Sequence, residues 1–196
     1  MQKELLIQYA AENFTKFGSK RVTLDELSSN LGISKKTIYK HFRSKEDLLT
    51  QSLSYLINQY HQQVNYILRD VEDPITKIII IYKIGFEHLK YFKPSFIFGL
   101  KKYYPKANEV FDTFRNETVL VTVFGLLEEA QTLNFIRKEV NLKLFCELYF
   151  NRFEEMAFKN NSVFDDYTIT ELLNHFVIFN LRGITSEDYK NDYFQF

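Results

Sequence analysis

The sequence predicts an all-α protein, and three observations support this fold class. Apolar residues recur at helical spacing along nearly all of the 196 residues. Six Gly and three Pro are too few for the many turns of an all-β fold. No segment alternates apolar and polar residues as a half-buried strand does. We therefore expect helices joined by short connections.

The first predicted helix covers about residues 2–17. Gly18 follows it, and glycine commonly ends helices because it tolerates positive φ. The apolar residues of this helix recur on one face, which we expect to be its inner face: Leu6, Ile7, Ala10, Ala11, Phe14 and Phe17.

Two short helices are predicted within residues 23–42. Thr23 and Glu26 have the spacing of a capping box at the start of the first. Gly32 ends that helix, and Ser34 caps the second. Two short helices joined by a glycine turn are the sequence form of a helix-turn-helix, in which the second helix reads DNA.

The charge pattern supports this interpretation, although the whole chain is neutral. The first 50 residues hold nine Lys and Arg against six Asp and Glu, whereas the other 146 hold 16 against 19. A solvated helix face is the simpler explanation of a basic run, but here the run coincides with the helix-turn-helix spacing. Between Glu26 and Glu46 there is no acidic residue, and the basic residues are Lys35, Lys36, Lys40, Arg43 and Lys45.

A long helix is expected over residues 45–68, capped by Ser44. Three prolines then predict where the following helices begin. Pro74, Pro94 and Pro105 each stand where a first helical residue would. A proline there loses no hydrogen bond, because the first N–H groups of a helix have no partner within it.

The helix that begins near Pro105 is expected over about residues 107–133, and two further helices are expected over about residues 142–159 and 166–181. Asn134 interrupts the first of them, and Gly183 is expected just past the end of the last. The final dozen residues are predicted to be loosely held, although Phe194 and Phe196 could dock.

Composition and motifs favour a cytoplasmic protein that is not an enzyme. The single Cys146 cannot form an intramolecular disulfide, and we expect it to be a buried apolar residue. No export signal or membrane-spanning run is found in the sequence. The histidines lack metal-binding spacings, and no phosphate-binding loop or nucleophile elbow is present. We expect no cofactor and no metal.

Residues 3–50 resemble the tetracycline-repressor (TetR) family of bacterial transcription regulators. The resemblance covers about a quarter of the chain. It implies an all-α homodimer of about nine helices, with an N-terminal three-helix helix-turn-helix head and a C-terminal helical domain. The DNA-binding domain would be residues 1–46, and the ligand-binding and dimerisation domain 47–196. The matching residues are Phe14, Phe17, Gly18, Val22-Thr23-Leu24, Leu31-Gly32-Ile33-Ser34, Thr37-Ile38-Tyr39, His41-Phe42, Ser44-Lys45-Glu46-Asp47-Leu48 and, near the end, Leu181-Arg182-Gly183-Ile184.

Candidate DNA contacts follow from the helix-turn-helix and from the resemblance. The leading residues of the recognition helix, Lys35, Lys36 and Thr37, are expected at base edges. The family pattern places Thr37 and Tyr39 at DNA, with Tyr39, His41 and Lys45 at phosphates. For His41, packing in the head is an equal alternative. The full candidate set is Thr23, Lys35, Lys36, Thr37, Tyr39, Lys40, His41 and Lys45, with Arg43 a looser candidate.

The family resemblance also implies a dimer through the last two helices and a small-molecule effector. The expected interface residues are Leu142, Phe145, Tyr149, Met156, Leu172, Phe176 and Phe179. The candidate ligand-binding residues are the aromatics Phe86, Phe96, Tyr103 and Phe111, which would suit an apolar or planar ligand. The alternatives are that both sets pack inside one chain, or that the protein binds DNA without an effector. Activation is the alternative to repression.

Overall fold

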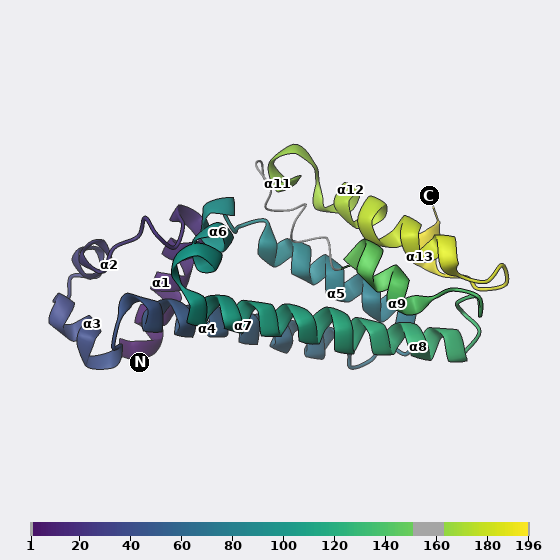
Figure 1. Cartoon of the computed structure of the whole chain (residues 1–196), viewed down its shortest axis with the longest axis horizontal. Coiled ribbons are helices and arrows are strands. Elements are labelled where there is room, and N and C mark those ends of the chain that lie inside the picture. Colours follow the sequence, from purple (N-terminus) through teal and green to yellow (C-terminus); the bar gives the residue numbers. More distant parts are fainter. Residues whose placement is uncertain (1, 151–162, 196) are drawn as a thin grey trace. The chain divides into compact units, whose positions relative to one another are not determined.

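The computed structural model describes residues 2–150 and 163–195, and it confirms the all-α class (Figure 1). Within these residues the only pairing of extended backbone is an isolated antiparallel bridge between Ile136 and Thr185. None of the helices described there combines the length and apolar character that a membrane span requires.

The three N-terminal helices form where the sequence predicts them. They are α1 (Gln2–Phe17), α2 (Leu24–Asn30) and α3 (Lys35–His41). Their contact is built from fully buried side chains, among them Phe14, Leu27 and Ile38. The expected inward position of Phe17 is wrong, because its side chain is 41% exposed and the Lys16 ammonium lies 5.2 Å from its ring centre.

The prolines mark helix starts as predicted. Helix α4 runs over Lys45–Leu68, and the next three helices begin at the prolines: α5 (Pro74–Leu89), α6 (Pro94–Tyr103) and α7 (Pro105–Asn116). Helix α7 continues through a π-helical segment (Glu117–Val123) into α8 (Phe124–Thr132). Asn134, at φ +59°, stands just past α8, where the interruption was expected.

Residue contacts divide the chain into two compact units. The first unit comprises residues 1–60 and 90–114, and the second comprises 61–89 and 115–196. Helix α6 and most of α7 therefore belong to the same unit as the three N-terminal helices. The division expected at residue 46 is one of function, and it stays a prediction.

In the first unit, α6 packs closely against the end of α1. Gly18 has φ +92°, and a Cβ atom there would lie 2.6 Å from Ser95 Oγ. Ser19 is fully buried and donates to the Phe96 carbonyl at 3.2 Å. On α6, a Cβ at Gly99 would overlap Ser19 Oγ. The absence of side chains at both glycines is what lets the two backbones approach.

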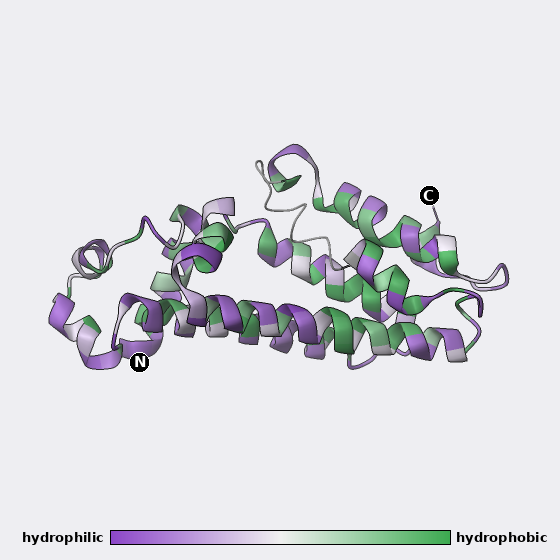
Figure 2. Ribbon diagram, viewed as in Figure 1, coloured by the Kyte–Doolittle hydropathy of each residue, from purple (hydrophilic) through white to green (hydrophobic). Residues whose placement is uncertain are grey.

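The second unit contains α5 and the C-terminal helices. Figure 2 shows α5 as mostly hydrophobic, in keeping with its buried Ile75, Ile78 and Ile79. The other elements are α9 (Leu142–Phe145), a π-helical segment (Cys146–Phe150), α11 (Val163–Asp166), α12 (Ile169–Leu173), a second π-helical segment (Asn174–Ile178) and α13 (Phe179–Ile184).

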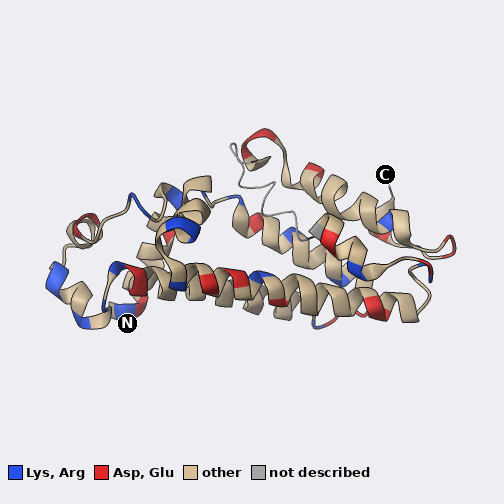
Figure 3. Ribbon diagram, viewed as in Figure 1, with Lys and Arg blue, Asp and Glu red and all other residues tan. Residues whose placement is uncertain are grey.

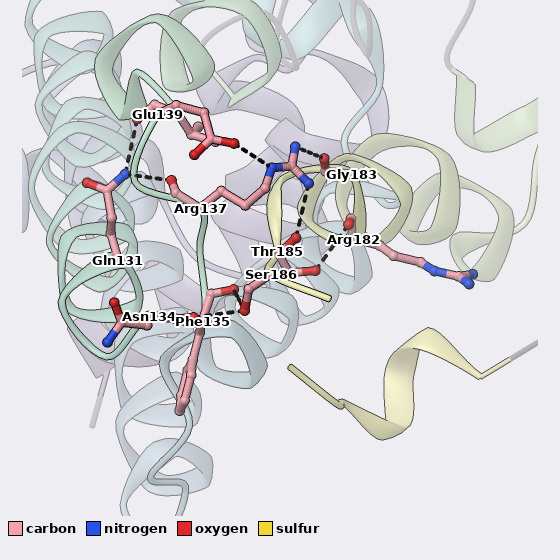
Figure 4. Close-up of polar contacts among 10 residues, drawn as sticks. Gln131, Asn134, Phe135, Arg137, Glu139, Arg182, Gly183, Thr185 and Ser186 are labelled. Atoms are coloured by element: carbon pink, nitrogen blue, oxygen red, sulfur yellow. Dashed lines mark hydrogen bonds and ion pairs between the residues drawn. The ribbon is translucent and has the colours of Figure 1, made fainter. Parts of the chain in front are cut away.

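The last helix differs from the prediction at both ends. A capping box of Thr168 and Glu171 starts it, two residues after the expected start at 166. The expected stop at Gly183 is also wrong, because the helix continues to Ile184. At the helix end the Arg137 side chain donates to the carbonyls of Gly183 (2.7 Å) and Thr185 (3.1 Å) (Figure 4).

Within residues 185–195 the chain is held by side-chain hydrogen bonds, contrary to the expectation of a loose tail. Tyr189 donates to Asp73 at 2.7 Å, and Asn191 donates to Thr76 Oγ1 at 2.9 Å. Asp73 also accepts from the Thr76 backbone N–H at 2.6 Å, so the tail binds the residues that cap α5.

Cys146 is buried as expected, and burial raises the pKa of its thiol to about 11.

We predict that Gly99→Ala destabilises the protein. The added methyl group would force Ser19 out of its hydrogen bond to Phe96, and overpacking of this kind costs about 1–3 kcal/mol. The melting temperature should fall by several degrees. Gly125→Ala is the matched control, because nothing lies within 4 Å of its Cβ position and alanine is the better helix former. Its melting temperature should rise. Equal shifts in both variants would contradict the close contact.

Candidate DNA-binding site

Capping hydrogen bonds build the predicted helix-turn-helix. The Thr23 backbone N–H donates to Glu26 Oε2 at 2.8 Å, and the Glu26 N–H donates to Thr23 Oγ1 at 3.1 Å. Gly32 has φ +63° in the turn, and Ser34 Oγ accepts from the Thr37 N–H at 3.1 Å at the start of α3. The two helices are thus fixed at both ends of the turn by local interactions that the sequence encodes.

The Glu26 carboxylate is held in its ionised form. The backbone hydrogen bond from Thr23 lowers the pKa of this carboxyl, and the Thr23 hydroxyl and the charges of Arg21 and Lys45 lower it further. A negative charge at the N-terminus of α2 also interacts favourably with the helix dipole. The capping box is therefore complete at neutral pH.

The outer face of α3 carries most of the candidate DNA contacts. Ile38 is fully buried and orients the helix, while Lys36, Tyr39 and Lys40 are exposed. Tyr39 has 51% of its surface accessible, so its side chain is not part of the core of the head. Thr37 is half-buried, and its hydroxyl shares a 2.9 Å hydrogen bond with Ser34. No acidic residue lies in α3, as the red and blue segments of Figure 3 show.

Lys35 is placed differently from its neighbours. Its ammonium forms a 2.9 Å ion pair with Asp25 of α2, and this hydrogen bond raises the pKa of Lys35. The pair is solvent-exposed, and such pairs contribute about 0–1 kcal/mol. A phosphate or a base could therefore replace Asp25 at little cost in free energy.

Lys45 lies at the N-terminus of α4, where the Asp47 N–H donates to Ser44 Oγ at 3.1 Å. Its ammonium donates to the Lys20 carbonyl at 3.1 Å and lies 5.4 Å from the centre of the Tyr104 ring. The Lys45 side chain is therefore hydrogen-bonded to the turn between α1 and α2. This turn leads directly to Thr23 at the start of α2. Thr23 itself is exposed.

His41 is half-buried at the end of α3. Its ring meets Phe42 edge-on, with the centroids 6.3 Å apart. Packing against the head is thus part of its role, and a phosphate contact stays a prediction.

The four candidate ligand residues are not brought together in one unit. Phe86 belongs to the second unit, whereas Phe96, Tyr103 and Phe111 belong to the first. Phe96 and Phe111 are buried, and Tyr103 is 39% exposed at the end of α6. The aromatic cluster that does form in the second unit surrounds Phe86, whose ring lies 6.0–6.3 Å from those of Tyr82, Phe164 and Phe176.

The candidate dimer residues fall into two groups. Leu142, Phe145 and Leu172 are buried within the chain and Phe176 is half-buried, in agreement with the alternative of packing inside one chain. Tyr149 and Phe179 are exposed by 37% and 40%, and Met156 lies outside the described residues. Sequence reasoning missed Leu144 and Leu148, which are 50% and 46% exposed. The i, i+4 spacing of these two leucines in the sequence indicates a second apolar face on the same helix.

Comparison with known proteins links this geometry to a family. The model for bacterial regulatory proteins of the tetR family matches residues 6–51, which include the capping box, Gly32 and Ser34.

Two relatives extend the likeness beyond the head. The nucleoid occlusion factor SlmA of Photorhabdus laumondii subsp. laumondii is 24% identical over 151 residues, covering 72% of this chain and 76% of that protein. The uncharacterized HTH-type transcriptional regulator YvaF of Bacillus subtilis is 26% identical over 174 residues, covering 85% and 87%.

A solved structure shows the same fold. A protein from Saccharomonospora viridis described as a transcriptional regulator, in complex with choline, matches with a TM-score of 0.76 at 13% identity. The match covers 95% of this chain and 98% of that one.

Proposed function

We propose that this chain, a DNA-binding transcriptional regulator of the tetR family, acts as a homodimer that binds a palindromic operator in the cytoplasm and is released by a small-molecule effector. The observation that carries the proposal is the outer face of α3. It presents Lys36, Tyr39 and Lys40 to solvent on a helix that capping hydrogen bonds and buried Ile38 hold in place. Such a face is what a recognition helix offers to a major groove.

The candidate residues divide between two proposed roles. Lys35, Lys36 and Thr37, at the N-terminus of α3, would contact base edges, with Lys35 exchanging Asp25 for DNA. Tyr39, Lys40 and His41 would contact phosphates from α3, and Thr23 and Lys45 from the starts of α2 and α4. Phosphate contacts fix the orientation of the protein, and base contacts select the sequence.

A homodimer would place two such helices on one duplex. Two-fold dimers present their recognition helices about 34–36 Å apart, one turn of DNA, or at multiples of that distance. The exposed apolar side chains Leu144, Leu148, Tyr149 and Phe179 support an interface in the second unit. Two pairs of helices packing across a two-fold axis would remove these side chains from water.

An effector would act through the second unit. The rings of Tyr82, Phe86, Phe164 and Phe176 pack against one another there, so a ligand among them would have to displace part of this packing. Rings of this kind also bind quaternary ammonium groups through cation–π attraction. Choline, which the structural neighbour from Saccharomonospora viridis binds, is thus a suitable first probe.

A second candidate function is DNA binding without a small-molecule effector. The likeness to SlmA, whose name gives it a role in nucleoid occlusion and mentions no effector, favours it. Activation in place of repression would use the same DNA contacts.

We predict that Tyr39→Ala weakens DNA binding roughly tenfold without unfolding the protein. A hydrogen bond to a charged group is worth about 1.5–3 kcal/mol, and an exposed side chain contributes little to folding. The duplex would be obtained by in vitro selection, and affinity and melting temperature would be measured. Tyr66→Ala is the control, because Tyr66 is 72% exposed outside the candidate site. Undiminished binding by Tyr39→Ala would remove this tyrosine from the proposed DNA contacts.

We predict that Leu148→Glu shifts the protein from dimer to monomer. A charge buried in an interface without a partner costs about 2 kcal/mol or more, which corresponds to a roughly 30-fold weaker dimer. Sedimentation over a range of concentrations would measure this. Leu5→Glu is the control, because Leu5 is 58% exposed on α1. A dimer of unchanged strength would place the interface elsewhere.

We predict that the effector raises the melting temperature and weakens binding to the selected duplex about 5- to 150-fold, the usual range of coupling between two sites. Choline would be tested first. A compound that stabilises the protein but leaves DNA affinity unchanged would argue against release by that compound. A wide ligand screen with no stabilising compound would favour the effector-free alternative.

A further inference from the structure

A second basic segment lies outside the helix-turn-helix. Residues 88–108 contain no Asp or Glu, and they cover the whole of α6 and the residues on either side of it. Their lysines are Lys90, Lys93, Lys101, Lys102 and Lys106, all exposed to solvent. In the parts of the chain that the structure describes, Lys90, Lys93, Lys102 and Lys106 form no ion pair.

Part of this segment forms a ridge with the turn after α1. We call Lys20, Phe98, Lys101, Lys102 and Tyr103 the α6 ridge. The Lys102 ammonium lies 5.5 Å from the Phe98 ring centre and 5.4 Å from that of Tyr103. On the other side of Tyr103, the Lys20 ammonium lies 4.7 Å from the ring centre and donates to the phenol oxygen at 3.3 Å.

The α6 ridge is continuous with the proposed phosphate contacts. Lys45 at the start of α4 donates to the Lys20 carbonyl at 3.1 Å, and Lys20 belongs to the ridge. Thr23 follows Lys20 by three residues and begins α2. Figure 3 shows Lys and Arg on α3, in the turn after α1 and on α6, all within the first unit.

Hydrogen bonds fix the ridge to the head. The Lys93 N–H donates to the Thr15 carbonyl at 2.9 Å, and the Lys106 N–H donates to Glu46 at 3.1 Å. The Tyr104 hydroxyl donates to the Ser19 carbonyl at 3.3 Å. Because these bonds join both ends of α6 to α1 and its following turn, and the start of α7 to α4, the ridge is held at a fixed place relative to the recognition helix.

We propose that the α6 ridge binds backbone phosphates of duplex DNA flanking the half-site that α3 reads. This inference rests on the proposed function. Lysines bind phosphates without regard to sequence. The rings of Phe98 and Tyr103 hold the Lys102 ammonium at the surface through cation–π contact. Because the ridge adjoins Lys45 and Lys20 in one unit, a duplex that extends past the half-site is the partner that charge and continuity favour.

The test compares duplexes of two lengths and two double variants. One duplex contains only the palindrome recovered by in vitro selection, and the other extends it by about one helical turn (roughly 10 base pairs) on each side. Lys101→Gln with Lys102→Gln removes two charges from the ridge. The control, Lys138→Gln with Lys143→Gln, removes two exposed lysines from the second unit. Affinity is measured over a range of salt concentrations.

The wild type and the control should bind the longer duplex more tightly than the shorter one. The ridge variant should lose most of this gain. Its salt dependence on the longer duplex should be shallower by roughly 0.9 for each phosphate that the variant no longer neutralises. Longer duplexes attract any cationic protein more strongly, so the comparison between the two variants decides the question.

Three results would overturn the proposal. If the ridge variant and the control gain equally from the longer duplex, the ridge does not contact flanking DNA. If the two variants gain equally and only the ridge variant loses binding to poly-L-glutamate, the ridge binds an acidic protein segment instead. If the wild type binds neither duplex above its affinity for random DNA, the proposed function itself fails.

Discussion

The contact between α6 and the turn that follows α1 determines which helices form one compact unit with the recognition helix. It depends on Gly18 and Gly99, which leave room for the Ser19 hydroxyl to reach the Phe96 carbonyl. Through this contact α6 joins the unit of the recognition helix, although residues 42–93 separate the two helices in sequence. The lysines of α6 and those of the head thus belong to one compact unit. A change in the position of α6 would therefore alter the packing of the head.

The same contact shapes how an effector could act. The chain passes from one unit to the other within α4, between α5 and α6, and within α7. A ligand among the rings around Phe86 would act first on α5, which ends at Leu89, four residues before Lys93 bonds to α1. Of the three connections, the one between α5 and α6 is thus the shortest along the chain, because the first unit resumes at Lys90, four residues after Phe86.

Local signals in the sequence predicted most of the fold, and tertiary contacts account for the errors. Thr23, Ser34 and the three prolines act on their own helix ends, so their roles can be predicted from neighbouring residues alone. Gly183 did not end its helix, and the helix end is bound by residues far away in sequence, among them Arg137, whose side chain donates to the Gly183 carbonyl. The tail binds Asp73 and Thr76, over 110 residues away in sequence, which no local pattern could indicate.

The candidate site shows the same division between local and distant causes. The exposure of Tyr39 followed from the buried position of Ile38, one residue away. The aromatic residues from 82 to 114 suggested one ligand site, but they are divided between two units. On α6 itself, Phe96, Ile97 and Leu100 are buried, while Phe98 and Lys102 face solvent. An aromatic-rich helix can therefore contribute to the core on one side and present aromatic and charged side chains to solvent on the other, and only the packing of α6 in the first unit shows which side is which.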